Sequence, residues 1–176
     1  MKQKILITAL LLTSVTLLML SCQKEVNQQG LQPQEEIATT IGTASNPTFN
    51  LEVILRGEEG RFGHIKFRQD VDPSKIIVLD TWIRGLEPDH QYLLQRAVDA
   101  ANVLDGDCTS TSWLTLGKGL TPQSILTDDN GTGSEELWRD ISMLASGTNF
   151  DIHFRVVDAS TMAVVLTSDC YQYVVR

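Results

Sequence analysis

Apolar and polar residues alternate along several segments of this chain, and that period of two constrains it to fold through β-strands. The first such segment places Phe49, Leu51, Val53 and Leu55 on one face. Because side chains of a strand point alternately to its two sides, the pattern predicts a strand with one buried face. Residues 63–68 repeat it, and the Gly-Glu-Glu-Gly turn at 57–60 between the two segments predicts a hairpin.

Further strands follow at intervals set by turn residues. They are expected over residues 76–83, 92–98, 109–116, 124–127 and 150–156, with two short strands over 163–175 around Cys170. The segment 76–83 is apolar on both faces and rich in β-branched residues, which is typical of a central strand buried on both sides. Between 128 and 133, the Asn130-Gly131 pair tolerates positive φ and predicts a tight hairpin turn.

Residues 137–145 fit two structures. Leu137, Ile141 and Leu144 would share one face of a helix, with Ser134 as N-cap and Gly147 beyond the end. The same stretch also alternates. The hairpin turn before it needs a partner strand, so we favour a strand at its start and a helical turn near Met143. With about eight strands separated by turns, the chain is expected to form an all-β antiparallel Greek-key sandwich or barrel.

The N-terminus has the three parts of a secretory signal. Lys2 and Lys4 precede a run from residue 5 to 20 that carries no charge, and the small Ser21 stands before Cys22. The run is shorter and more strongly flanked than a spanning helix, which needs about 20 apolar residues. Met19 to Cys22 resembles a bacterial lipobox, which implies cleavage after Ser21 and acylation of Cys22, with palmitate among the expected groups.

The sequence therefore divides into a lipoprotein signal over 1–21, a tether over 22–47 and a β-domain over 48–176. The tether has no aromatic residue and is rich in Gln, Thr and Gly, so it cannot bury enough apolar surface to fold. Gln23 stands where an inner-membrane retention signal would have Asp. We therefore expect a lipid-anchored protein of the outer membrane or cell surface of a Gram-negative type bacterium.

Charge limits the partners of the exported chain. The full sequence has 14 basic and 22 acidic residues, a net charge of −8, and loss of Lys2 and Lys4 with the signal lowers it to −10. Nucleic acids and anionic lipid surfaces both need a basic face, so neither is expected as an electrostatic partner. If lipid occupies Cys22, the remaining two cysteines stand in an oxidising compartment, and we predict a Cys108–Cys170 disulfide.

The order of these features resembles the copper–zinc superoxide dismutase family, and more loosely the related chordin-type sandwiches. The resemblance rests on residues 53–57 with 63–69, 83–88 with His90 and Tyr92, 107–110, 127–131 and Cys170. It implies a dismutase-like sandwich, with an immunoglobulin-like sandwich as the alternative. The family's copper ligands, however, would fall on Leu93 and Gln95 and on or near Asp158, and residues 109–130 hold no histidine for zinc. The resemblance therefore implies the scaffold without the dismutase chemistry, and we expect no cofactor and no catalytic site.

Other candidate sites have simpler explanations. His64, His90 and His153 are the only histidines and none has the spacing of metal-ligand pairs, so we expect no metal. Residues 128–139 begin like a calcium loop but end on Arg139 in place of the bidentate Glu, although Asp128, Asp129 and Glu135 could bind calcium weakly.

Trp113 and Trp138 are candidates for an aromatic platform that binds a flat ligand, and core packing is the alternative explanation for both. The sequence thus predicts a lipid-anchored, non-catalytic binding module for a glycan, peptide or protein. A metal-binding or enzymatic protein with relocated ligands and a purely structural envelope lipoprotein are the alternatives.

Overall fold

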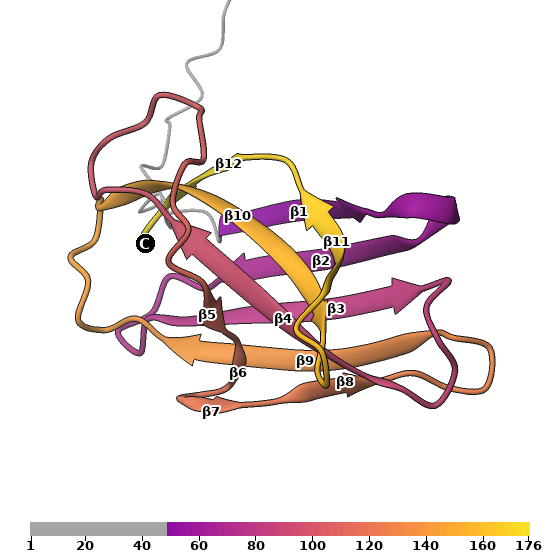
Figure 1. Ribbon diagram of the computed structural model, residues 1–176. Helices are drawn as coiled ribbons and strands as arrows, with labels where there is room; N and C mark the ends of the chain where they lie inside the picture. Colours follow the sequence, from indigo (N-terminus) through magenta and orange to yellow (C-terminus); the bar gives the residue numbers. More distant parts are fainter. Residues whose placement is uncertain (1–48) are drawn as a thin grey trace, which may run out of the picture. The chain divides into compact units, whose positions relative to one another are not determined.

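The computed structural model describes residues 49–176, and these residues form an all-β domain (Figure 1). The strands are β1 (Phe49–Arg56), β2 (Phe62–Gln69), β3 (Ile76–Arg84), β4 (Gln91–Val98), β5 (Leu114–Thr115), β6 (Gly117–Lys118), β7 (Thr121–Pro122), β8 (Ser124–Leu126), β9 (Gly133–Asp140), β10 (Asn149–Asp158), β11 (Val164–Ser168) and β12 (Tyr171–Val174). A 3-10 turn, η1 (Glu58–Gly60), joins β1 to β2. The predicted signal and tether lie outside the described residues.

The strands form a nearly closed barrel of mixed pairing. Neighbours follow the order β4-β10-β11-β1-β2-β3-β9, and β11 pairs with β1 only at Leu55↔Ser168 and Arg56↔Thr167. Strand β8 pairs with β4 and meets β9 through the Thr127↔Gly133 bridge, which brings the two ends of the circuit together. The contact of β6 with β9 is parallel and the other strand pairs are antiparallel. In Figure 1, β4 and β10 cross in front of β1, β2, β3 and β9 as a second layer.

The core fills the space between these layers and follows from the alternation in the sequence. Strand β2 buries Gly63, Ile65 and Phe67 and turns the residues between them outward, as predicted. Phe67 lies at the centre, with its ring centroid 4.9 Å from that of Tyr173 and 6.3 Å from that of Phe154. Full burial of each such side chain contributes about 1.5–3 kcal/mol, so the barrel interior is the main source of stability.

Three predictions about strands were wrong in detail. Residues 76–83 are buried on one face only, because the outer face of β3 is not covered by a second layer and leaves Ile76 exposed. Residues 109–113 form no strand, since side-chain hydrogen bonds rather than a neighbouring strand hold them. The described domain has twelve strands and not about eight, and two of them, the short β6 and β7, lie where no strand was expected.

The ambiguous stretch at 137–145 begins as a strand. Strand β9 pairs with β3 along its whole length, up to Asp140 opposite Ile76. The chain then makes one hydrogen-bonded turn, in which the Leu144 N–H donates to the Ile141 carbonyl at 2.9 Å. Met143 is 95% exposed in this turn, whereas Ile141 is buried and Leu144 packs against the core.

The predicted Cys108–Cys170 disulfide is confirmed. The two Cα atoms are 5.4 Å apart and 62 residues apart in sequence. The bond joins the long loop after β4 to the break between β11 and β12. At this break the Ser168 hydroxyl accepts a hydrogen bond from the Phe154 N–H at 2.9 Å, so the side chain replaces a missing strand partner.

Within the described residues, no helix is long and apolar enough to cross a membrane.

The first prediction concerns this disulfide. Replacing both cysteines, Cys108→Ser with Cys170→Ser, should lower the free energy of unfolding by about 4 kcal/mol, because the unfolded chain regains the entropy of a closed loop. Urea denaturation measures the change, and the m-value should rise because the unfolded state expands. Cys22→Ser is the matched control and should leave the transition in place. Equal midpoints for the double variant and the unchanged protein would contradict the prediction.

Candidate functional site

The segment 99–113 joins β4 to β5 and is held in place by carboxylates; we call it the disulfide loop because it contains Cys108. Asp99 accepts hydrogen bonds from the backbone N–H of Thr109 and of Ser110, both at 2.9 Å, and from the Thr109 hydroxyl at 3.0 Å. The two backbone hydrogen bonds are the main reason why the pKa of Asp99 is lowered. The lowered pKa favours the ionised carboxylate, which holds Thr109 and Ser110 in place through these hydrogen bonds.

A second carboxylate anchors the other arm of the disulfide loop. Asp151 on β10 is fully buried, and its Oδ2 accepts the backbone N–H of Asp105 and of Gly106, both at 2.9 Å. Its Oδ1 is buried and has no hydrogen-bond partner in the part of the chain described by the structure. Together with the disulfide, Asp99 and Asp151 give this long irregular segment a defined conformation.

Trp113, at the end of the disulfide loop, lies flat against the outer face of β10. Its ring centroid is 4.6 Å from that of His153, with 29° between the ring planes, and the Arg155 guanidinium carbon is 4.0 Å from its ring centroid. His153 and Arg155 are two residues apart on a strand, so both point to the same side and the indole covers them together. A cation–π contact of this kind contributes about 0.5–2 kcal/mol.

Polar contacts fix the two side chains under the indole. Arg155 Nε donates to Gln95 Oε1 at 2.7 Å, and the buried Gln95 donates in turn to the Thr115 hydroxyl at 3.0 Å. His153 Nε2 lies 3.0 Å from the Ser110 carbonyl oxygen, which can only accept, so Nε2 carries the proton. We call Trp113, His153, Arg155, Gln95 and Thr115 the Trp113 cluster.

A hollow of about 450 Å³ lies beside this cluster. It is lined by the end of β4 and by the disulfide loop, with Asp99, Asp105 and Ser112 among its polar walls and Val98 and Val103 among its apolar ones. A few fixed polar groups beside apolar surface are typical of ligand sites. Trp113 itself is only partly exposed.

The other two tryptophans lie elsewhere. Trp138 is on β9, is 36% exposed, and lies against Gly119, where an added Cβ would come within 2.9 Å of the indole. Trp82 on β3 makes an edge contact with Phe62, and Arg84 lies over both rings. Within residues 49–176 no ring contact joins Trp113 to Trp138, so the structure does not bring the two predicted platform residues into one aromatic surface.

The three histidines do not converge. His64 contacts Glu52, His90 Nε2 lies 2.6 Å from an Asp158 carboxylate oxygen, and His153 belongs to the Trp113 cluster. Across residues 49–176, no group of three or more His, Cys, Asp or Glu side chains is arranged to hold a metal ion.

The calcium-like segment is a hairpin turn. Asp128 Oδ1 accepts the backbone N–H of Asn130 and of Thr132, both at 2.9 Å, and Glu135 pairs with Lys118 at 2.6 Å. Gly131 has φ of +70° and packs so tightly that an added Cβ would lie 2.1 Å from the Leu86 carbonyl oxygen. The predicted hairpin turn is thus present. The three acidic side chains that could have bound calcium weakly have other partners, with Asp129 accepting from the Asn130 side chain, and the turn needs its glycine.

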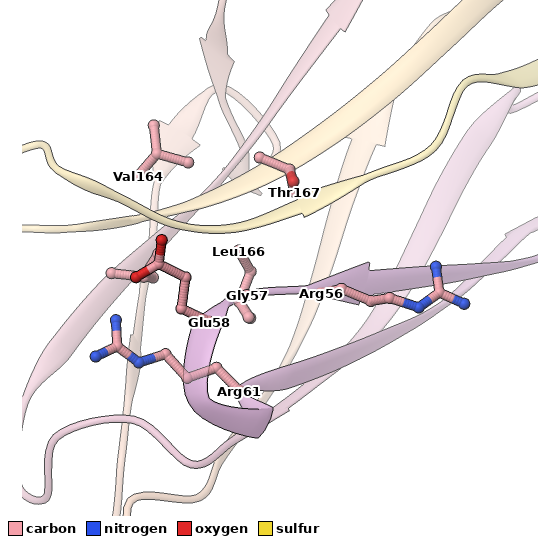
Figure 2. A pocket seen from close by; sticks show the side chains of 8 residues that line it. Arg56, Gly57, Glu58, Arg61, Val164, Leu166 and Thr167 are labelled. Atoms are coloured by element: carbon pink, nitrogen blue, oxygen red, sulfur yellow. The ribbon is translucent and has the colours of Figure 1, made fainter.

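Figure 2 shows another hollow, of about 270 Å³, between the β1–β2 turn and β11. Its two arginines extend in different directions in Figure 2. Arg56 pairs with Asp169 at 3.3 Å and Arg61 with Glu59 at 3.6 Å. Both arginines already have carboxylate partners at the surface. This hollow is therefore a weaker candidate for a ligand site than the Trp113 cluster.

Sequence reasoning identified Trp113 but not what lies beneath it. The available signal was the placement of His153 and Arg155 at polar positions of a strand whose other face is apolar. That pattern indicates an outward pair, but it does not show which loop covers it.

Comparison with protein-family models gives no match for this chain, and no curated protein matches it either.

The second prediction concerns Asp99. Its lowered pKa means that its hydrogen bonds stabilise the loop above the unfolded-state pKa of about 3.9 and are lost as pH falls below about 4. The protection factors of the Thr109 and Ser110 amides, which correct for the slower intrinsic exchange in acid, should therefore fall on acidification. In Asp99→Ala both protection factors should already be low at neutral pH and should no longer change with pH. Asp107→Ala, in the same loop, is the control, and equal protection in both variants would show that Asp99 does not hold the loop.

Proposed function

We propose that this chain is a lipid-anchored lipoprotein of the outer membrane or cell surface whose β-domain is a non-catalytic module that binds a glycan at the Trp113 cluster. The observation that carries the proposal is the indole held flat over Arg155 and His153 beside a hollow with an ionised carboxylate. Sugar rings present C–H faces that pack on an indole and hydroxyl groups that donate to carboxylates. Both complementary groups are present on one ordered surface.

Preorganisation supports a binding role for this surface. The side chains beneath the indole are fixed by hydrogen bonds at 2.7–3.0 Å, and the loop beside it is held by Asp99, Asp151 and the disulfide. A ligand would therefore meet groups that already have their bound arrangement, which reduces the entropy that binding costs. A long loop of purely structural purpose would not need so many anchors.

For the scaffold, we propose the Greek-key sandwich of the dismutase-like type. Three consecutive strands, β1, β2 and β3, are joined by hairpins, and the chain then crosses past β9 and β8 before it enters β4, which supports a Greek-key connection. The positions where the resemblance would put copper ligands have other roles. Gln95 accepts from Arg155, and Asp158 pairs with His90. The proposal therefore takes the fold of that family without its redox chemistry.

The proposal of a lipid anchor is argued from the sequence alone. Cys22 after an uncharged run and a small residue supports acylation, and the polar stretch that follows supports a tether between lipid and domain.

The third prediction tests the ligand. On a glycan array, the purified chain should bind a subset of glycans, and Trp113→Ala should weaken binding to them at least tenfold, the equivalent of about 1.4 kcal/mol. Trp138→Ala, also a partly exposed tryptophan, should leave affinity unchanged. If binding were lost in Trp138→Ala and kept in Trp113→Ala, the site would be misplaced. Binding only to peptides or proteins would show that the ligand class is wrong.

The fourth prediction tests the anchor. Cells expressing the chain should incorporate labelled palmitate into it, and Cys22→Ser should abolish the label because no other residue is expected to be acylated. Ser21→Ala keeps a small residue before the cysteine and should retain the label. Labelling that persists in Cys22→Ser would contradict lipidation at this position.

A further inference from the structure

The barrel has a cavity of about 150 Å³ at the end where β2 finishes and β3 and β10 begin. Its walls are almost entirely apolar and include Phe67, Ile77, Phe150, Ile152 and Tyr173. The single charged side chain that lines it is that of Arg96 on β4. This cavity faces inward, so it is separate from the Trp113 cluster on the outer face of the same strands.

Incomplete closure of the barrel explains why space remains here. Strand β8 pairs only with Gln91, Tyr92 and Leu93 of β4, so it closes the seam between β4 and β9 at one end. Beyond that point β4 pairs with the two residues of β5, and Arg96 lies opposite Leu114. The inward residues of β4 near its end therefore face space that no full-length strand covers.

Arg96 has no ion-pair partner within the described part of the chain. The charged group that acts on it is Arg139 of β9, whose like charge lowers the pKa of Arg96 further after burial has lowered it. Lys75, another cation near this end, donates to the Leu144 carbonyl at 2.8 Å. Arg96 is only partly exposed, and withdrawing a cation from water without an anion beside it is costly.

We propose that this cavity binds a small aromatic carboxylate of about the size of benzoate, with its ring among the apolar walls and its carboxylate on the Arg96 guanidinium. A cavity of about 150 Å³ lined by apolar side chains accommodates one benzene ring. The planar guanidinium matches a carboxylate through two parallel hydrogen bonds. Arg139 adds positive potential on the same side and therefore favours an anion over a neutral ring.

The test uses two probes of equal size, benzoate and the neutral benzyl alcohol, titrated into the full chain and followed by the methyl NMR signals of Ile77, Ile141 and Ile152. Benzoate should shift these signals in a saturable way and bind at least tenfold more tightly than benzyl alcohol, as expected for a charge-assisted pair. Arg96→Met, which keeps the length of the stem, should reduce benzoate affinity to that of benzyl alcohol. Arg84→Met, an exposed arginine on β3, is the matched control and should bind benzoate as before.

Two further variants keep the test decisive if Arg96→Met folds poorly. Arg96→Lys retains the positive charge but loses the two parallel N–H donors of the guanidinium, so it should give intermediate benzoate affinity. Leu144→Phe adds volume to the cavity wall and should weaken both probes. The proposal would be overturned if benzoate produced no saturable shift, if Arg96→Met or Arg96→Lys bound it as tightly as the unchanged protein, or if Leu144→Phe left both affinities unaltered. The glycan experiments on Trp113 are unaffected by any of these outcomes.

Discussion

Strand β10 is the element on which the rest of the domain depends. It pairs with β4 along one edge over seven residues, and along the other edge with β12 and then β11. Its inner face contributes Phe150, Ile152, Phe154 and Val156 to the core, while its outer face carries Asp151, His153 and Arg155. A register slip of one residue would exchange these two sets, so the pairing with β4 fixes both the core and the outer surface at once.

The same pairing explains why two arginines close together in the fold have opposite roles. Gln95 lies opposite Arg155, and Arg96 lies opposite Phe154. Arg155 points outward and is satisfied by Gln95 and by the Trp113 ring. Arg96 points into the barrel, where apolar walls offer it no such partner. Alternation along the two paired strands thus gives the outer face an arginine with polar and aromatic partners and the inner face an arginine beside apolar walls.

The sequence was sufficient for most of the strands because their alternation is local. It predicted the β1–β2 hairpin, the β8–β9 turn with Gly131, and the disulfide, for which only one pair remained. It was insufficient for residues 109–113, since Thr109 and Ser110 are held by Asp99 at the start of the same loop and not by a neighbouring strand. It also could not place Arg96, because Gln95 and Arg96 are adjacent polar residues and only the register shows which of them turns inward.

The disulfide also determines how the domain responds to mechanical load. Because Cys108 and Cys170 are joined, the residues between them form a covalently closed loop that cannot lengthen the chain when it is pulled. A force applied between β1 and the disulfide loop can extend only the residues from 49 to 108, and it must first separate β1 from β2, which are paired over eight residues. About half of the barrel is therefore shielded from the pulling force. That half includes Trp113, Thr115, His153 and Arg155 of the Trp113 cluster, whereas Gln95 lies on β4, outside the closed loop.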